Sequence, residues 1–541
     1  MTDAASKKPA RRRRLATLAF LAAVTVGGGL IGPRLVAVPD ATSAGMKEYA
    51  DLLATIRASY ADEIAPSKLV YASIHGMLAS LDPHTNFLEP EEYGALQEKQ
   101  RGSFYGLGII ISKRNGKVTV ITPLEGSPAE RLGIRAGDII DRVEGQPIDD
   151  LAVDAVVRKL KGPKGSKVRI TIVRPGLSEP LQMTVTRAEI PTNSVSYAFL
   201  IEPATGYIRL KDFTQTSSQE LAESWEKLEK QGMKRLVFDL RGNPGGLLDQ
   251  AVGVSDFFLS KGDKVVSTRG RTAGSDQTFV APGRNTKPRL PVIVLLNKGS
   301  ASASEIVAGA VQDHDRGLIV GQTSWGKGLV QSVFTLSDGA GLALTTAKYY
   351  TPSGRCIQRD YKDVLEYLAP ESDEGGDDAE TPESRETFRT DAARLVHGGG
   401  GITPDVLVKG EPLSRFASML YARGMFFEFA VQYRAKHPEI PRDFQVTDAV
   451  REEFFRFLEG KPEMGWDGSA KEKYAAEKDP QVVDSAIREE LLTAVYGREA
   501  GYRSSLEGDV VLRKALTLFP EAEKLAARRA GALVARAATP H

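Results

Sequence analysis

The chain has 541 residues and a formal net charge of +1, with 41% hydrophobic and 26% charged residues. This composition is typical of a globular protein, and the length suffices for about two to four domains. The balanced charge argues against a nucleic-acid-binding protein, which requires a concentrated basic surface. The single cysteine, Cys356, cannot form an internal disulfide, and the six histidines show no ligand spacing. We therefore expect no metal site.

Residues 1–45 indicate export. Lys7, Lys8 and Arg11 to Arg14 precede residues 15–32, which carry no charge. A basic patch followed by about 18 uncharged residues is typical of a signal peptide or of a single membrane anchor. The positive-inside rule keeps the basic stretch in the cytoplasm and places the rest of the chain across the membrane. Cleavage and retention both stay open, and we expect a location in the periplasm or on the outer face of the cytoplasmic membrane.

The hydrophobic pattern divides the rest of the chain into four regions. Residues 46–99 have helical spacing, up to a turn-rich connector in which Pro83 and Pro90 are expected to break helices. Residues 100–189 read as short strands with glycine turns and one helix. Residues 190–409 alternate strands with helices, which predicts an α/β layer structure. Residues 410–541 are mostly helical.

Residues 361–391 are acidic and contain few large apolar side chains, which predicts a mobile surface loop. The acidic side chains lack the fixed spacing of a calcium-binding loop.

Ser302 lies where a predicted strand, ending near Leu296, turns into a predicted helix. Ser302 and Glu305 match the Ser-x-x-Glu capping box, so one interpretation is that Ser302 only caps the helix. A serine at a strand-to-helix turn is also where α/β enzymes present a nucleophile, because free N–H groups at a helix start stabilise an oxyanion. The turn alone leaves both interpretations open.

A serine nucleophile needs a base that takes its proton. Asp313 and His314 lie about 12 residues along the helix, roughly 18 Å from Ser302, which is beyond hydrogen-bond reach. Lys327 follows that helix and a further strand, a route that returns the chain to the helix start. The surrounding sequence, "GQTSWGKG", is close to a phosphate-binding loop, but Gly328 replaces the hydroxyl that would hold magnesium. A nucleotide-binding role is therefore rejected.

Lysine acts as a base only when it is neutral, so its pKa of about 10.4 must fall by roughly three units through burial. A site with few carboxylates and apolar walls such as Trp325 would have this effect. Residues two apart on a strand share a face, so Lys327 and Gln331 are expected to project together. The uncharged Gln331 amide could then hold the lysine. His84, in a turn that ends a helix, is interpreted as structural.

These residues resemble the carboxyl-terminal processing proteases, also called tail-specific proteases. The resemblance lies in the middle serine of "SASASE", the lysine of "GKG" and the glutamine four positions later, and in "GMLASLDPHTNFLEPEEY", "GIRAGDIIDRVEGQPI", "FDLRGNPGGLL", "YYTPSGRCIQ" and "GGGITPDV". It covers most of residues 46–408 and implies a crotonase-like (ClpP-like) α/β protease core. It also implies that Ser302 is the nucleophile, Lys327 the general base and Gln331 the residue that orients the lysine, with no cofactor.

The resemblance further implies an oxyanion hole formed by the N–H group of Ala303 and one from "DLRGNPGG". We place Gly245 ahead of Gly246 there, and the alternative is that this loop is only a tight turn. Asp313 matches an acidic position of the family, and the distance argument above makes it structural. The acidic loop and the helices after residue 409 extend beyond the common core, and neither is expected to contact the catalytic residues.

Residues 100–189 resemble a PDZ domain inserted ahead of the protease core. PDZ domains bind an extended chain end by strand addition, and a glycine-containing loop holds the terminal carboxylate. "YGLGI" fits that loop, with Gly106 and Gly108 allowing close approach and Tyr105, Leu107 and Ile109 lining the groove. The groove should favour apolar side chains at the substrate's end. Lys161 lies where relatives often have an arginine that has been tied to regulation.

Together these observations predict an exported serine endopeptidase that binds the C-terminal ends of polypeptides and cleaves them through an acyl-enzyme. The alternative is a catalytically idle PDZ scaffold of the cell envelope. The helices after residue 409 are expected to support self-association or binding of an adaptor protein. No nucleic-acid partner is expected, and a membrane contact is expected only through an uncleaved N-terminal anchor.

Overall fold

The computed structural model describes residues 40–114, 116–285, 287, 290–361, 367, 386–410, 413–461, 469–477 and 480–538. The chain divides into two compact units, Met1–Leu81 and Asp82–His541. The first unit contains α2 (Asp40–Ser59) and α3 (Pro66–Ala79), which confirms the helices expected there. The predicted export segment, residues 15–32, lies outside the described residues. Among the residues that the structure describes, none of the helices has the length and apolar character needed to span a membrane.

The segment after Asp82 differs from the expected connector. It forms β1 (Asn86–Leu88) and then α4 (Pro90–Arg101). Pro90 begins α4 instead of breaking a helix, because the first helical residue needs no N–H partner and the ring fixes φ at a helical value. β1 pairs antiparallel with β18 (Gly341–Tyr350), which ties this segment to the core of the second unit.

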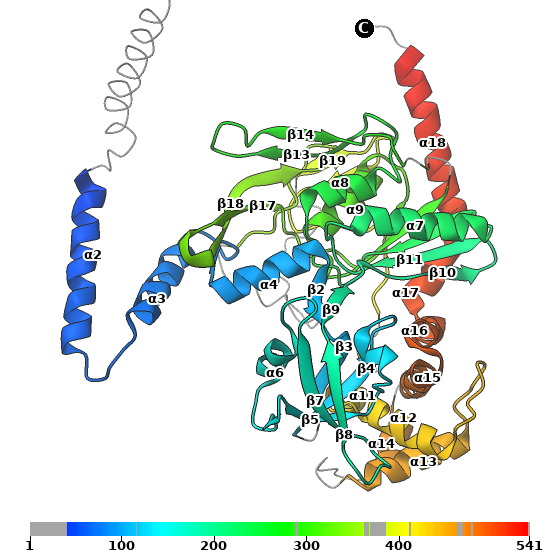
Figure 1. Cartoon of the computed structure of the whole chain (residues 1–541). Coiled ribbons are helices and arrows are strands. Elements are labelled where there is room, and N and C mark those ends of the chain that lie inside the picture. The colour runs from blue at the N-terminus through cyan, green and yellow to red at the C-terminus, as the bar shows by residue number, and fades with distance from the viewer. Residues whose placement is uncertain are drawn as a thin grey trace, which may run out of the picture. The chain divides into compact units, whose positions relative to one another are not determined.

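Residues 103–191 form a small domain around five strands that are antiparallel neighbours in one sheet (Figure 1). The strand order is β3-β4-β5-β7-β8, with bounds Ile109–Arg114, Lys117–Pro123, Ile139–Val143, Lys167–Val173 and Leu181–Thr186. These strands and α6 (Val153–Leu160) confirm the expected pattern. The sequence did not predict the pair of β2 (Ser103–Gly106) and β9 (Ala188–Pro191), which joins the two ends of the domain.

The main sheet of the second unit has six strands in the order β10-β11-β12-β15-β16-β21. Their bounds are Val195–Glu202, Thr205–Leu210, Arg235–Asp239, Val292–Leu296, Leu318–Gly321 and Val406–Leu407. All neighbours from β11 to β21 are parallel, and β10 is antiparallel to β11. The connections contain α7 (Ser217–Lys230), α8 (Leu248–Ser255) and α9 (Ala303–Asp313). This arrangement confirms the predicted α/β layers.

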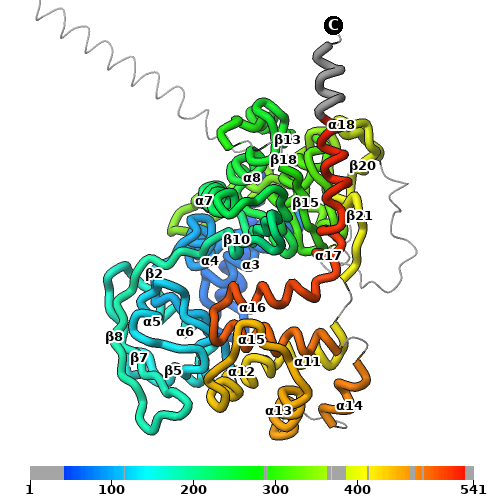
Figure 2. The backbone as a smooth tube through the Cα atoms, turned by 90° about the vertical axis from the view of Figure 1, so that its right-hand side faces the viewer, coloured from blue at the N-terminus to red at the C-terminus, as the bar shows by residue number. Residues whose placement is uncertain are grey.

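Helices cover both faces of this sheet. Side chains that alternate along the strands point to opposite faces, so Phe238 packs with α7, α8 and α9, whereas Val237 packs with the C-terminal helices. Those helices are α17 (Val510–Thr517) and α18 (Phe519–Ala538), which contact β15 and β16. Figure 2 shows α17 and α18 running beside the strands of the core. The end of the C-terminal region therefore packs onto the α/β core, whereas the sequence led us to expect these helices to extend beyond the common core.

The remaining C-terminal helices form a cluster of their own. They are α11 (Arg415–Ala422), α12 (Met425–Lys436), α13 (Asp448–Glu459), α14 (Ala470–Ala475) and α15 (Gln481–Tyr496). Their core contains the aromatic side chains of Phe426 and Phe429, each of which contacts Phe454. α16 (Arg498–Ser505) leads from this cluster to α17.

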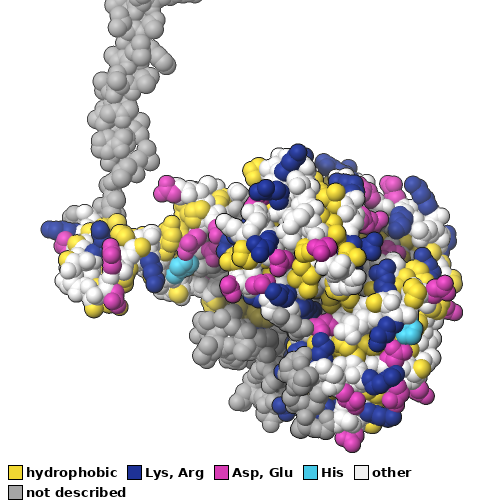
Figure 3. Space-filling model, turned by 60° about the horizontal axis from the view of Figure 1, so that its bottom comes forward, with side chains coloured by type: hydrophobic (Ala, Val, Ile, Leu, Met, Phe, Trp, Pro, Cys, Tyr) yellow, Lys and Arg dark blue, Asp and Glu magenta, His cyan; other side chains and the backbone are white. Residues whose placement is uncertain are grey.

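A second sheet contains β18, β13 (Lys264–Arg269) and β14 (Gln277–Val280), with β17 (Leu329–Thr335) paired to β18. The predicted acidic loop is partly ordered. β19 (Thr387–Arg389) pairs with β20 (Leu395–His397), and Tyr367 is buried. Residues 362–366 and 368–385 lie outside the described residues. On the face drawn in Figure 3, basic and acidic side chains are intermixed, in keeping with the balanced charge.

The packing of α18 on the sheet gives a stability prediction. Phe519 is fully buried in the cluster between α17, α18 and the sheet. We expect Phe519→Ala to lower the free energy of unfolding by about 3–5 kcal/mol, because it removes buried apolar area and leaves a cavity. Val510→Ala, at a residue that is 39% exposed on α17, should change it by only about 0.5 kcal/mol. Denaturant unfolding of both variants measures the difference, and equal small effects would contradict the proposed packing.

Candidate active site

Ser302 lies at the turn between β15 and α9, as the sequence predicts. Its backbone has φ 54° and ψ −114°, in a region that residues with a side chain rarely occupy. Such strain persists only where the surrounding structure holds it, and it is typical of functional turns. The Ser302 N–H donates to Glu305 Oε2 at 2.7 Å, so the part of the predicted capping box that Glu305 supplies is present.

Glu305 connects the serine turn to the lysine loop. Its fully buried carboxylate also accepts from Ser324 Oγ at 2.5 Å, from the Gly326 N–H at 2.7 Å and from the Lys327 N–H at 2.9 Å. Burial raises the pKa of Glu305, and these hydrogen bonds oppose the rise. The sequence indicated Glu305 only as a capping residue, because its other partners lie about twenty positions away along the chain.

Lys327 is partly buried, and its amine donates to Gln331 Oε1 at 2.7 Å. Burial lowers the pKa of Lys327, and the negative charges of Glu305 and Asp82 act in the opposite direction. The direction of the predicted shift is confirmed. The expectation of few carboxylates is wrong, since two carboxylates lie near enough to act on the lysine.

Lys327 and Gln331 meet for a different reason from the one predicted. Lys327 precedes β17 and is not part of it, and the pairing of β17 with β18 is irregular between Val330 and Gln331. Strand alternation therefore does not align the two side chains. Glu305 holds the loop that carries Lys327, and Gln331 lies on the irregular part of β17. Together these two features place the Lys327 amine against the Gln331 amide.

The turn at residues 82–85 holds Gln331 from the other side. The Gln331 Nε2 group donates to the carbonyl oxygen of His84 at 2.6 Å. The ring Nε2 of His84 lies 2.6 Å from the Tyr367 hydroxyl, which also accepts from Trp325 Nε1 at 3.2 Å. Burial lowers the pKa of His84 to about 4, the Lys327 charge adds to this effect, and Asp82 opposes it.

His84 thus positions Gln331 through its backbone and contacts Tyr367 through its ring, which agrees with the structural interpretation of this residue. The only sequence signal for these contacts was the place of His84 in a segment that resembles the family. Tyr367 could not be found from the sequence, because it falls in the stretch predicted to be a mobile loop.

The glycine loop after β12 lies against Ser302. A Cβ atom on Gly245 would lie 2.8 Å from Ser302 Cβ and from the Ala303 nitrogen, and one on Gly246 would lie 2.1 Å from the Phe213 carbonyl oxygen. The Gly245 N–H already donates to Asn243 Oδ1 at 2.8 Å. Within the described part of the chain, the N–H groups of Gly246 and Ala303 have no bonded acceptor. This conformation therefore favours Gly246 over Gly245 as the free donor.

Asp313 and His314 make hydrogen bonds to parts of the fold away from Ser302. Asp313 Oδ1 accepts from the buried Arg355 at 2.7 Å, and its Oδ2 accepts from the Ser353 N–H at 3.0 Å. His314 contacts the Asp391 carboxylate and the Lys264 carbonyl oxygen. The contacts of Asp313 agree with its structural interpretation, and those of His314 agree with its exclusion as the base.

The loop predicted to hold a chain end lies beside an open strand edge. β3 is an edge strand of its sheet and, among the described residues, pairs only with β4. Leu107 is buried, and Ile109 packs against the same core as Val156 of α6. A Cβ atom on Gly108 would lie 2.3 Å from Ser127 Cβ, so this loop requires glycine there.

The other residues predicted for this loop flank it. Tyr105 and Gly106 belong to β2, and the Gly162 N–H lies 3.4 Å from the Tyr105 carbonyl oxygen. Lys161 follows α6 and pairs with Glu98 of α4 at 2.6 Å, with its amine also over the Phe104 ring.

Family models match three regions of the chain. Residues 204–364 match peptidase family S41, residues 119–174 match a PDZ domain, and residues 416–463 match the C-terminal helical domain of probable PDZ-proteases. In the described residues there is no group of three or more histidine, cysteine or acidic side chains placed to hold a metal ion.

Related proteins carry the name of carboxy-terminal processing proteases. The carboxy-terminal-processing protease of Bartonella bacilliformis is 40% identical over 317 residues, which are 58% of this chain and 72% of the relative. The carboxyl-terminal-processing protease of Synechocystis sp. is 40% identical over 296 residues, 53% of this chain and 68% of the relative. A solved photosystem II D1 C-terminal processing protease is 30% identical, with a TM-score of 0.35 over 68% of this chain and 93% of the other. The chain therefore belongs to the carboxy-terminal processing proteases of peptidase family S41, which are serine-type peptidases with a PDZ domain.

Proposed function

We propose that the chain is an exported endopeptidase that binds the C-terminal end of a polypeptide in its PDZ groove and cleaves the polypeptide with a Ser302–Lys327 pair. The observation that carries the proposal is the partly buried amine of Lys327, held by Gln331 in a loop that Glu305 joins to the Ser302 turn. A parallel sheet with the serine turn at its carboxyl edge supports a crotonase-like core.

The reaction begins when neutral Lys327 takes the Ser302 hydroxyl proton and the oxygen adds to the scissile carbonyl carbon. The tetrahedral oxyanion is stabilised by the N–H groups of Ala303 and of Gly246 or Gly245. Collapse breaks the C–N bond, and the Lys327 ammonium returns the proton to the leaving amine. Lys327 then deprotonates a water that attacks the ester, which releases the acid and regenerates Ser302. Gln331 keeps the amine in place without adding charge, and no metal or nucleotide takes part.

The PDZ groove supplies the contact with the substrate end. The open edge of β3 offers backbone groups for strand addition, and the partly buried Ile109 offers an apolar side chain at the start of that edge. Among the described residues, the N–H groups of Leu107 and Gly108 have no bonded acceptor, so they can hold a terminal carboxylate. Polypeptides with apolar C-terminal residues fit this groove.

Binding of a chain end in the groove can affect the position of the catalytic residues through α4. Lys161 and Arg158, at the end of α6, pair with Glu98 and Glu91 of α4. α4 follows the turn whose His84 carbonyl oxygen holds Gln331. We infer that Lys161 has a regulatory role along this route.

Export, membrane anchoring, self-association and adaptor binding stay predictions. Since α17 and α18 are packed on the sheet, self-association would use other faces of the C-terminal helices. Light scattering of the purified chain decides whether it is monomeric.

The central test replaces the proposed nucleophile. Ser302→Ala and Lys327→Ala should each lower kcat by about 10⁴-fold or more on an unstructured polypeptide, because they remove the attacking atom or its base. Ser337→Ala, at an exposed residue, serves as the control. If Ser302→Ala cleaves the substrate at the native rate, the assignment is wrong and the idle-scaffold alternative gains support.

The pH dependence follows from the charges around Lys327. Activity needs the neutral amine, so kcat should rise with pH, with a midpoint below the ordinary lysine pKa because burial lowers the pKa of Lys327. Asp82 raises this pKa, so Asp82→Asn should move the midpoint to lower pH. Asp249→Asn, at an exposed carboxylate, should leave it unchanged. A midpoint that Asp82→Asn leaves in place or moves upward contradicts this assignment of the base.

Recognition of the chain end predicts a dependence on the terminal carboxylate. A peptide substrate that ends in an apolar residue should lose affinity when its C-terminus is amidated, with KM rising about 10-fold through loss of a charged hydrogen-bonded contact. Lys161→Gln should leave this KM difference intact and change kcat only. Equal KM values for the acid and the amide would exclude the groove as the binding site.

A further inference from the structure

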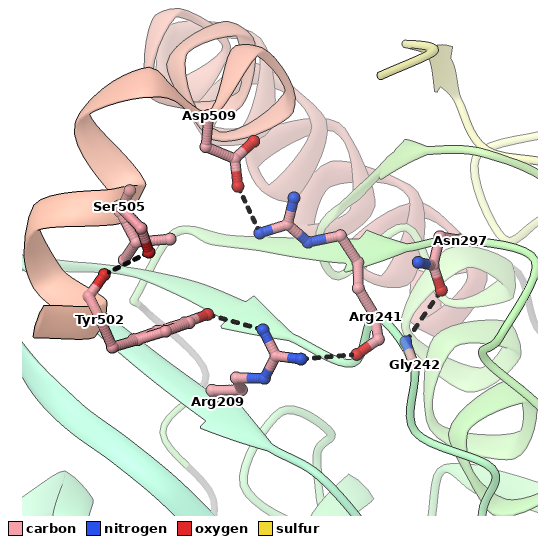
Figure 4. A pocket seen from close by; sticks show the side chains of 8 residues that line it. Arg209, Arg241, Gly242, Asn297, Tyr502, Ser505 and Asp509 are labelled. Atoms are coloured by element: carbon pink, nitrogen blue, oxygen red, sulfur yellow. Dashed lines mark hydrogen bonds and ion pairs between the residues drawn. The ribbon is translucent and has the colours of Figure 1, made fainter. Parts of the chain in front are cut away.

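A pocket of about 310 Å³ lies between the C-terminal helices and the carboxyl edge of the main sheet (Figure 4). Arg209 at the end of β11 and Arg241 after β12 line it from the sheet, and Tyr502 of α16 and Asp509 before α17 line it from the helices. Gly242 and Asn297 also line it. Each of these two residues begins a loop of the catalytic site, one leading to Gly245 and the other to Ser302.

Asp509 binds Arg241 with one oxygen and caps α17 with the other. Its Oδ2 lies 2.7 Å from Arg241 Nη2, and its Oδ1 accepts from the Val511 and Leu512 N–H groups at 2.9 Å. The same Nη2 group and the Nε group of Arg241 also donate to the fully buried Asp239 at 2.6–3.0 Å. Arg241 is therefore fixed between a carboxylate of the sheet and a carboxylate of the C-terminal helices.

Tyr502 holds the neighbouring arginine. Its hydroxyl accepts from Arg209 Nη1 at 2.6 Å and lies 2.7 Å from the Tyr207 hydroxyl, which itself donates to Asp239. The Tyr502 ring stacks on Tyr197 with centroids 3.9 Å apart. Figure 4 shows the Arg209 side chain directed toward Tyr502 and the Arg241 side chain directed toward Asp509.

Arg241 leads directly into the glycine loop. The Gly242 N–H donates to Asn297 Oδ1 at 2.8 Å. The next residue, Asn243, holds the Gly245 N–H with its side chain, and its carbonyl oxygen accepts from the Ala301 N–H and from Ser304 Oγ at 3.0 Å. Because so few residues separate Arg241 from Gly245 and Gly246, a displacement of Arg241 moves the loop relative to Ser302.

We propose that Asp509 and Tyr502 are positioning residues for the peptidase reaction, which fix Arg241 and Arg209 and so hold the glycine loop against the Ser302 turn. This inference rests on the proposed function, because the loop matters to catalysis only as an oxyanion hole. The helices that follow residue 409 then contribute to turnover as well as to folding.

Asp509→Asn separates the two roles of this residue, because asparagine caps a helix about as well as aspartate but carries no charge for Arg241. We expect kcat of Asp509→Asn and of Tyr502→Phe to fall about 10-fold with KM little changed. The affinity for a peptide boronate, which forms a tetrahedral anion with the serine, should fall by the same factor. Binding of an uncleaved peptide to the same variants in the Ser302→Ala background should not change.

Two further variants control for folding. Glu507→Gln removes the ion pair that the exposed Glu507 side chain makes with Arg488, and it should leave kcat unchanged. Asp509→Glu retains the charge and should recover part of the lost kcat.

Native kcat and boronate affinity in both Asp509→Asn and Tyr502→Phe would overturn the inference, even if the melting temperature falls. A lower kcat without a change in boronate affinity would overturn it as well, because the oxyanion loop would then be intact. Failure of the proposed function is a separate result, since it appears as native activity in Ser302→Ala.

Discussion

The proposed catalytic arrangement depends on the buried carboxylate of Glu305. It receives hydrogen bonds from Ser302, Ser324, Gly326 and Lys327, so one side chain fixes the serine turn and the lysine loop together. A charge without partners at this depth would cost several kcal/mol, and the four donors offset that cost. The same charge acts against a neutral lysine, so burial of Lys327 has to outweigh Glu305 and Asp82. The uncharged glutamine at position 331 fits this balance, because it holds the Lys327 amine without raising the pKa of Lys327 further.

The parallel sheet explains why segments distant in sequence meet at this carboxylate. β11, β12, β15 and β16 are parallel, so their carboxyl ends lie at one edge, where ligands bind in open α/β sheets. The glycine loop follows β12, Ser302 follows β15, and the lysine loop follows β16. The turn at His84 reaches the site from a separate direction through β1, which pairs with β18. One edge thus receives the proposed nucleophile, the proposed base and the two proposed oxyanion donors.

The local sequence pattern was enough to predict the principal helices and strands and the principal candidate site residues. What it missed has physical causes. β12, β15 and α9 follow from apolar runs and capping residues, and the spacing of Ser302, Lys327 and Gln331 carries the family resemblance. The contact between Gln331 and His84 spans 247 positions, and no local pattern encodes such a contact. The strand-face argument for Lys327 and Gln331 failed because it assumed a regular strand where the pairing is irregular. Pro90 was misassigned because proline favours a helix start as strongly as it disfavours a helix interior.

The C-terminal helices show why composition could not separate the core from its extension. An amphipathic helix that covers a sheet and one that awaits a partner have the same periodicity, so the sequence could not place α17 and α18. In the structure, Leu512 and Phe519 cover the face of the sheet that carries Val237 and Ile293. Loss of these helices would expose a continuous apolar surface, which soluble chains rarely tolerate. Asp509 caps the start of α17, the first of these covering helices. The helices that bury the sheet therefore also contact Arg241, which precedes the glycine loop. Stability of the core and geometry of the proposed oxyanion hole therefore share one structural element.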